Sequence, residues 1–302
     1  MNIKNFKLTG KVIALGLASA FIYSCTDPKP TQENDDNLPD TDTVKAMALN
    51  VGGELFSVPS PIQTALLVKK SGVAYDKTIL NPGNKNGQYV SEFTKALNLG
   101  VYGADLGYVS IYSQTQDALV YLGAVKKIAD KLGITAAFDK QTLDRINNNI
   151  SNKDSILTLV GIAYRASDAY LKTNKRTEIS SLILTGGWIE SMYFCVNTYN
   201  KKPTNEIKYR IAEQKQALKS ILKLIYSHNL PGAKDLIKDL EDLSKTYEGI
   251  TTKYIYVEPT TDESKKITYI NSTTEIVVSK EQLDQITKQL TAIREKIINA
   301  KS

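Results

Sequence analysis

Residues 89–112 read YVSEFTKALNLGVYGADLGYVSIY, and this stretch decides the fold class. The spacing of its apolar residues predicts one long α-helix. Gly100, Gly103, Ala104 and Gly107 form two pairs of small residues four positions apart on this helix. Each glycine inside a helix costs about 0.5–1 kcal/mol relative to alanine. We therefore expect a compensating feature here, either the close approach of a neighbouring helix or space for a ligand beside the backbone.

Helix signals continue on both sides of this stretch. Two segments, 113–116 (SQTQ) and 279–282 (SKEQ), have the spacing of a capping box and predict helix starts. Pro203 lies where the first turn of another helix is expected, and an apolar stripe continues from there to Ile225. Together with the remaining periodic segments, these signals predict further helices at about 62–70, 113–133, 140–150, 154–173, 177–199, 203–225, 231–247 and 279–297.

The pattern changes near residue 250. Residues 251–257 and 266–270 are rich in β-branched and aromatic side chains, and a turn-forming segment separates them, which predicts a β-hairpin. A third strand at 274–278 is an open alternative. Because a two-stranded ribbon is marginal by itself, we expect it to pack on the helices or on a partner. The sequence therefore predicts a mainly α fold, a helical bundle or helix-hairpin array, with a small C-terminal β-hairpin (about 251–278) and a closing helix.

The N-terminus has the pattern of an export signal. Lys4, Lys7 and Lys11 precede an apolar or small-residue run at residues 12–22, which is eleven residues long. That length suits the hydrophobic region of a signal peptide, and it falls short of the ~20 residues that a helix needs to span a bilayer. The sequence therefore predicts export rather than a spanning helix at this end of the chain.

Residues 22–25 read Ile-Tyr-Ser-Cys and resemble the lipobox of bacterial lipoproteins, with an aliphatic residue three positions and a small residue one position before the cysteine. Tyr23 is bulkier than the residue usual at its position. The resemblance implies that residues 1–24 are a lipoprotein signal peptide and that cleavage precedes Cys25. It also implies a diacylglyceryl thioether on Cys25, which holds the protein at a membrane through its acyl chains.

Behind Cys25 the chain divides into two further parts. Residues 25–44 are rich in acids and prolines and predict a disordered tether, because they cannot bury enough apolar surface to offset the entropy of ordering. Residues 45–302 are predicted to form one mainly helical domain. Beside the lipobox, residues 99–108 (LGVYGADLGY) are similar to helical lipoproteins of Bacteroidetes envelopes. This resemblance implies a location in the cell envelope, at the outer membrane, and it brings no activity with it.

Composition argues against several classes of function. The formal net charge of +6 falls to +3 when the three lysines of the predicted signal peptide are removed, which is too little to attract nucleic acid. His228 is the sole histidine and Cys195 the sole cysteine beside Cys25, so imidazole triads and zinc or thiolate clusters have little support. No phosphate-loop, dinucleotide-binding, serine-hydrolase or zinc-protease motif occurs. We expect no cofactor, no metal and no nucleic-acid partner.

Three carboxylates stand inside otherwise apolar helical stretches: Asp105, Asp168 and Glu190. Buried carboxylates need partners, so structural networks are one interpretation. The other is a glycosidase-type acid–base pair, which requires two carboxyl groups about 5–9.5 Å apart across a cleft. Aromatic rings of the same helices favour binding surfaces, and the candidates for ligand contact are Tyr102, Tyr108, Tyr112 and Trp188.

These observations predict a membrane-anchored envelope lipoprotein with a non-catalytic binding or scaffold role. Its partners would be the membrane, through the lipid on Cys25, and an unidentified protein or small-molecule ligand, with the hairpin as a second candidate contact. The alternative is a carboxylate-based hydrolase that acts on glycan through two of Asp105, Asp168 and Glu190.

Overall fold

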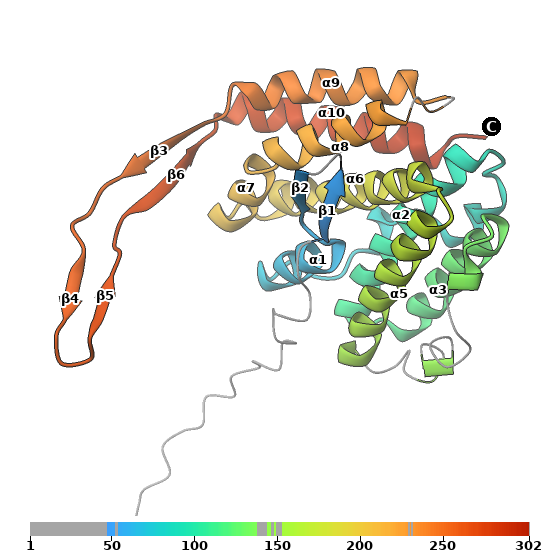
Figure 1. Ribbon diagram of the computed structural model, residues 1–302, viewed down its shortest axis with the longest axis horizontal. Helices are drawn as coiled ribbons and strands as arrows, with labels where there is room; N and C mark the ends of the chain where they lie inside the picture. The colour runs from blue at the N-terminus through green and yellow to red at the C-terminus, as the bar shows by residue number, and fades with distance from the viewer. Residues whose placement is uncertain are drawn as a thin grey trace, which may run out of the picture. The chain divides into compact units, whose positions relative to one another are not determined.

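The computed structural model describes residues 47–51, 54–137, 144, 145, 148, 153–228, 230 and 232–301. The predicted signal peptide, Cys25 and the tether lie outside the described residues, as does most of the helix expected at 140–150. Helices dominate the described part of the chain (Figure 1), and the predicted mainly α fold is confirmed.

Nine α-helices occur among the described residues, and local signals explain several of their starts. The Ser60 hydroxyl accepts a hydrogen bond from the backbone N–H of Gln63, and Ser91 does the same for Thr94. The helices are α1 (Pro61–Lys70), α2 (Glu92–Ile111), α3 (Thr115–Lys131), α5 (Lys153–Thr173), α6 (Thr177–Lys201), α7 (Asn205–Ala212), α8 (Lys215–Ser227), α9 (Lys234–Glu248) and α10 (Lys280–Ile298). Short 3₁₀ turns lie between some of them, namely η2 (Lys77–Ile79), η3 (Gly83–Gly87) and η4 (Thr135–Ala137).

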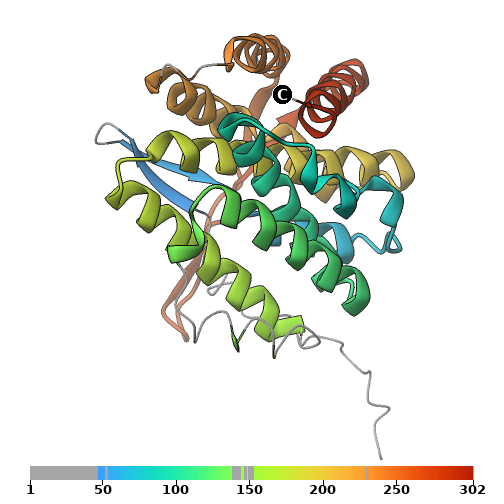
Figure 2. The ribbon, with the colours of Figure 1, turned by 90° about the vertical axis from the view of Figure 1, so that its right-hand side faces the viewer.

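Helices α2 and α6 form the centre of the domain. Helix α2 packs against α1, α3, α5 and α6, and α6 packs in addition against α7, α8 and α10 (Figure 2). By length and hydropathy α6 passes as a membrane span, the one helix among the described residues to do so, yet 89% of its apolar window is buried inside the domain. That is the environment of a core helix, most of whose surface is covered by its neighbours.

Two helix starts differ from the prediction. The predicted capping box at 113–116 is wrong, because α3 begins at Thr115 after Gln114 and no side chain caps it. Ser113 lies one residue too early and adopts the left-handed backbone conformation (φ 58°) of the tight turn after α2. The predicted helix at 203–225 is two helices, α7 and α8. The break between them places the Gln214 amide oxygen where it accepts a hydrogen bond from Trp188 Nε1 at 3.1 Å.

Strands occur in two places, before the first helix and between the last two helices of the described chain. Near the N-terminal end, β1 (Met47–Val51) and β2 (Glu54–Val58) form an antiparallel pair, which the sequence analysis did not predict. The predicted C-terminal hairpin is present, but its pairing differs from the one expected. Strand β3 (Thr251–Ile255) pairs with β6 (Thr273–Val277), the segment left as an open alternative, and β4 (Thr260–Asp262) pairs with β5 (Ile267–Tyr269).

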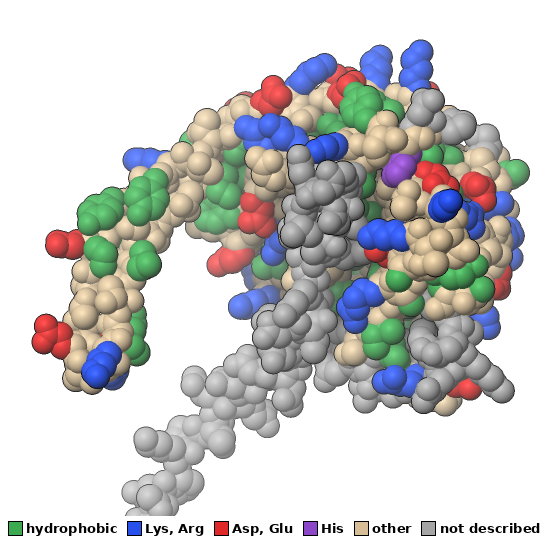
Figure 3. Space-filling model, viewed as in Figure 1, with side chains coloured by type: hydrophobic (Ala, Val, Ile, Leu, Met, Phe, Trp, Pro, Cys, Tyr) green, Lys and Arg blue, Asp and Glu red, His purple; other side chains and the backbone are tan. Residues whose placement is uncertain are grey.

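These four strands form one long ribbon, the arm, which leads away from the helices (Figure 1). All five residues of β3 are exposed, and most of the arm's apolar side chains face solvent (Figure 3). The expectation that the ribbon packs on the helices is therefore wrong for most of its length. Packing on a partner stays a prediction. The exposed apolar residues of the arm are Tyr254, Ile255, Tyr256, Val257, Ile267, Tyr269, Ile270 and Val277.

The closing helix α10 follows the prediction. Ser279 and Gln282 form the expected capping box. The predicted apolar stripe is buried, and α10 lies along α9 and α6 (Figures 1 and 2). The stripe consists of Leu283, Ile286, Leu290, Ile293 and Ile297. The helix therefore packs back onto its own domain and covers one side of α6.

Candidate functional site

The small residues of α2 permit a close contact with α6. A Cβ atom added to Gly100 would lie 2.0 Å from the backbone oxygen of Ile183, and one added to Gly186 would lie 1.9 Å from the backbone oxygen of Leu97. The backbones of the two helices thus touch at these glycines, which confirms the first of the two expectations for this glycine-bearing stretch. The contact also brings the acidic residues of α2 and α6 together.

Glu190 of α6 forms a buried ion pair with Arg294 of α10. Arg294 Nε donates to Glu190 Oε2 at 2.7 Å and Nη2 donates to Oε1 at 2.8 Å, which is the bidentate geometry of a strong charge-assisted pair. Nη2 also donates to the backbone oxygen of Ile79 at 2.7 Å. The guanidinium lies over the ring of Tyr193, 4.1 Å from its centroid. The side chains of Arg294 and Glu190 are only 4% and 0% exposed.

Asp105 of α2 lies beside this ion pair and is also fully buried. Neither of its carboxyl oxygens has a hydrogen-bond partner among the described residues. Burial, followed by the negative charge of Glu190, raises the pKa of Asp105 well above its usual range, and the charge of Arg294 offsets this only in part. Asp105 therefore keeps its proton to a higher pH than an exposed aspartate does.

The three candidate carboxylates do not form one site. Asp105 and Glu190 come together, but Asp168 lies on α5, where Lys172 Nζ contacts its carboxylate at 2.6 Å and Ser180 Oγ donates a hydrogen bond to it. Asp105 and Glu190 have no exposed surface, and both oxygens of Glu190 bind Arg294. A sugar cannot reach a pair enclosed in this way. The arrangement matches a structural network better than a glycosidase pair.

The four aromatic candidates belong to the core. Tyr102, Tyr108 and Trp188 are buried and Tyr112 is half-buried. Their polar atoms bind groups of the domain itself: Tyr102 and Tyr112 donate to backbone oxygens at 2.9 and 2.8 Å, and Tyr108 accepts from the backbone N–H of Asp76 at 3.1 Å. These side chains satisfy their hydrogen bonds internally, which is the usual behaviour of buried tyrosine and tryptophan. Tyr102, Tyr108 and Trp188 present almost no surface to a ligand, and the hydroxyl of the half-buried Tyr112 is bound to the backbone oxygen of Val73.

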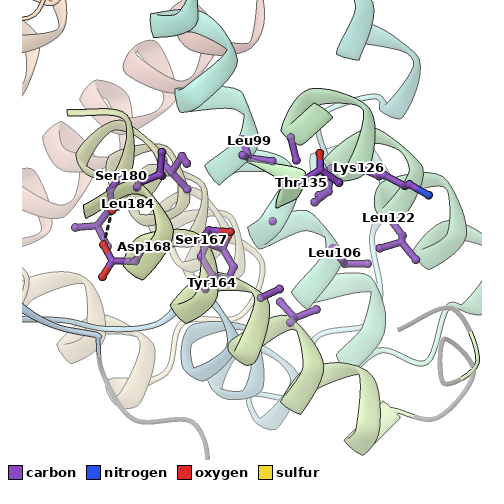
Figure 4. Close-up of a pocket in the computed structure, with 17 residues that line it drawn as sticks. Leu99, Leu106, Leu122, Lys126, Thr135, Tyr164, Ser167, Asp168, Ser180 and Leu184 are labelled. Carbon is purple, nitrogen blue, oxygen red and sulfur yellow. Dashed lines mark hydrogen bonds between the residues drawn. The ribbon is translucent and has the colours of Figure 1, made fainter. Parts of the chain in front are cut away.

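A cavity of about 110 Å³ lies between α2, α3, α5 and α6 (Figure 4). Its walls are mainly aliphatic, whereas its polar groups come chiefly from α3, η4 and the second half of α5. In Figure 4, Lys126 extends away from the space between the helices, and Asp168 lies at the opposite side, bonded to Ser180. The aliphatic wall includes Leu99, Leu106, Leu122, Val125, Val160 and Ile183.

Gly103 and Tyr164 meet at the wall of this cavity. A Cβ atom on Gly103 would lie 2.0 Å from the hydroxyl oxygen of Tyr164, so the tip of the ring occupies the notch that the glycine leaves in α2. The Tyr164 hydroxyl donates a long hydrogen bond of 3.4 Å to the backbone oxygen of Gly100. The space beside the backbone at Gly103 is therefore filled by Tyr164, and the second expectation for the glycine-bearing stretch, space for a ligand beside the backbone, is not met at this glycine.

Of the cavity residues, sequence analysis had singled out only Gly103 and Asp168. Gly103 stood out by the cost of glycine inside a helix, and Asp168 stood out as an acid in an otherwise apolar helical stretch. The rest of the wall comes from ordinary core residues of four helices, which carry no local mark of a cavity. Comparison of the chain with protein-family models, curated proteins and solved structures finds no match.

Proposed function

We propose that this protein is a lipid-anchored component of the cell envelope whose helical domain binds an apolar ligand without converting it. The observation that supports this best is the cavity between α2, α3, α5 and α6. Protein interiors contain few voids larger than a water molecule, and a concave, mostly apolar space with a few polar groups is the usual form of a small-molecule site. An apolar cavity of about 150 Å³ takes up benzene, so one of about 110 Å³ suits a slightly smaller hydrocarbon group.

The alternative, a carboxylate-based hydrolase acting on glycan, has less support. Asp105 and Glu190 are adjacent but enclosed, and neither lines the cavity. Asp168 does line it, yet Lys172 and Ser180 bind its oxygens. An acid–base mechanism needs a second carboxyl across the cleft, and Asp168 is the one acidic side chain among the residues that line the cavity. Binding fits the cavity better than hydrolysis does.

Ligand binding can be tested by filling the cavity. Ala163 lies on α5 in the cavity wall, and Ala163→Phe adds a ring there. Each excluded methylene loses about 0.8 kcal/mol of hydrophobic stabilisation, so excluding two weakens binding about tenfold. We expect a photoactivatable octanol carrying a diazirine to label the cavity residues of the wild-type chain in membranes, as mapped by mass spectrometry. The variant should label about tenfold less at the same probe concentration.

Ala169→Phe is the matched control, because Ala169 is an exposed residue of the same helix outside the cavity. It should label like the wild type. If octanol labels only the protein surface, or if both phenylalanine variants label equally, the cavity is not a binding site and the proposed function fails.

The proposed anchor rests on the lipobox resemblance at residues 22–25. Several acyl chains on Cys25 hold a protein stably at a bilayer, since each buried methylene contributes about 0.8 kcal/mol. We expect an alkyne-tagged palmitate fed to cells to label the wild-type chain and to leave Cys25→Ala unlabelled. Cys195→Ala should keep the label, because Cys195 is fully buried. A labelled Cys25→Ala variant, or a purified native chain that begins at Met1, would contradict the anchor.

A further inference from the structure

The chemistry of the cavity wall narrows the kind of ligand it takes. Leucine, isoleucine, valine and alanine make most of the wall, and Tyr164 is its one aromatic ring. The Tyr164 hydroxyl already donates to Gly100, and Asp168 is neutralised by Lys172. Lys126 points its amine away from the space (Figure 4). A group that enters the cavity therefore meets mainly aliphatic carbon, a few hydroxyl-bearing side chains such as Thr135 and Ser167, and no free charge.

The cavity is also partly open to solvent, and this opening bears on the shape of ligand that can enter. Leu122 and Val125 on α3 and Ala163 and Ser167 on α5 are only partly buried, so the opening lies between these two helices. A volume of about 110 Å³ holds a short hydrocarbon segment rather than a whole lipid. The end of a chain can enter this space while the polar end of the same molecule stays in water at the opening.

Gly103 and Tyr164 are in close contact at the wall of the cavity. The phenol ring rests against α2 because Gly103 has no side chain, and a Cβ there would come within 2.0 Å of the hydroxyl oxygen and 2.8 Å of Cζ. The ring of Tyr164 would then have to move, and the added methyl group would itself protrude from the wall. One turn further along α2, Gly107 faces a different neighbour. A Cβ on Gly107 would lie 3.6 Å from Ile62, which is ordinary contact.

We propose that the ligand of this cavity is the end of an unbranched alkyl chain and that Gly103 and Tyr164 set the length of chain accepted. This inference rests on the proposed function, because it names the ligand class for the same cavity. Gly103 allows the ring of Tyr164 to rest against α2. The ring then forms the part of the cavity wall that the end of the alkyl chain contacts. A compact ring of equal carbon number would fit less well, since it cannot pass the opening end first.

The test uses the full-length chain in membranes and diazirine-bearing alkanols of four, eight and twelve carbons. Gly103→Ala should reduce labelling of the cavity by the eight-carbon probe about tenfold, as expected when about two methylenes are excluded. Gly107→Ala, the same substitution on the same helix, should label like the wild type. Tyr164→Ala should shift the preferred probe towards twelve carbons, and in that variant Gly103→Ala should have little further effect because its clash partner is gone.

Competition between the photoactivatable probe and unlabelled compounds identifies the shape and the natural source of the bound alkyl chain. Unlabelled 1-octanol should displace the probe at lower concentration than cyclooctanol does. Octanoate and a short-chain phospholipid, added in parallel, distinguish a free fatty acid from a membrane lipid as the natural source of the alkyl chain.

Three results would overturn the inference. The first is equal labelling of Gly103→Ala and Gly107→Ala, the second is stronger competition by cyclooctanol, and the third is an unchanged chain-length preference in Tyr164→Ala. Should Gly103→Ala fail to fold, Tyr164→Ala alone still decides the matter. Failure of the proposed function looks different, because no probe then labels the cavity of the wild type.

Discussion

Arg294→Ala is expected to lower the free energy of unfolding by about 3–5 kcal/mol, the usual loss when one partner of a buried ion pair is removed. The substitution leaves the Glu190 carboxyl enclosed and removes both of its guanidinium contacts. It also removes the donor to the Ile79 backbone oxygen and the contact with the Tyr193 ring. Urea unfolding followed by circular dichroism measures the change.

The matched control removes both charges at once. Replacing a buried pair by apolar side chains of similar volume is often nearly neutral, so Glu190→Met combined with Arg294→Met should recover most of the stability that Arg294→Ala loses. Lys296 is a second control. It is an exposed cation of the same helix, pairs with Asp239 at 2.6 Å, and should cost at most about 1 kcal/mol when replaced by alanine. Equal losses at Arg294 and Lys296 would contradict the enclosed pair.

Asp105→Asn, in the same cluster, should act in the opposite direction. Because the folded state raises the pKa of Asp105, the folded chain binds more protons than the unfolded chain above the ordinary aspartate pKa of about 3.9. The contribution of this carboxyl is therefore most favourable below about pH 4 and declines as the pH rises towards the raised pKa, by up to about 1.4 kcal/mol per pH unit. The variant should gain stability relative to the wild type between pH 4 and 8. A constant difference over this range would contradict the raised pKa.

The sequence predicted most of the helices, because their signals are local. The stripe of α10, its capping box at Ser279 and the cost of glycine in α2 are all visible within a few residues. The break between α7 and α8 was missed because no glycine or proline marks it in the sequence. Gln214 turns towards Trp188 of another helix, and no spacing rule within 203–225 contains that contact.

The buried cluster was predictable only in part. Asp105 and Glu190 stood out as acids in apolar helices, but Arg294 looked like any charged residue of an amphipathic helix. Its partner lies 104 positions away in the sequence, and such a pairing leaves no local pattern. Asp168 met the same sequence criterion as the other two acids and lies elsewhere, because the criterion says nothing about which helices become neighbours.

The pairing of the arm shows a related limit. All of its strands are rich in β-branched residues, and most of their side chains are exposed on both faces of the ribbon. Register is strongly specified only where one face is buried, so the hydrophobic pattern alone did not separate the 266–270 and 273–277 segments as partners of β3. The cavity was hidden for another reason, since it is the space left between ordinary core residues of four helices.

The contact between α2 and α6 leads to the other large expected effect. Gly100→Ala places a methyl group 2.0 Å from the Ile183 backbone oxygen and 2.6 Å from the Gly187 backbone nitrogen. These are backbone atoms of a buried helix, so the clash cannot be relieved by rotating a side chain. The two helices must separate, and overpacking of this kind costs about 3 kcal/mol at the upper end of its range. Thermal and urea unfolding should both show the loss.

Two other glycines provide controls of opposite sign. Gly107→Ala on α2 meets only ordinary contact with Ile62, and Gly123→Ala on the exposed side of α3 meets nothing within 4 Å. Alanine is the better helix former by about 0.5–1 kcal/mol, so both substitutions should leave stability unchanged or raise it. Gly186→Ala approaches the same interface from α6, with a Cβ 1.9 Å from the Leu97 backbone oxygen, and should destabilise as Gly100→Ala does. The outcome that would contradict the contact is equal stabilisation of the domain by all four glycine-to-alanine substitutions. In that case α2 and α6 would not touch at Gly100 and Gly186, and the cost of glycine in α2 would need another explanation.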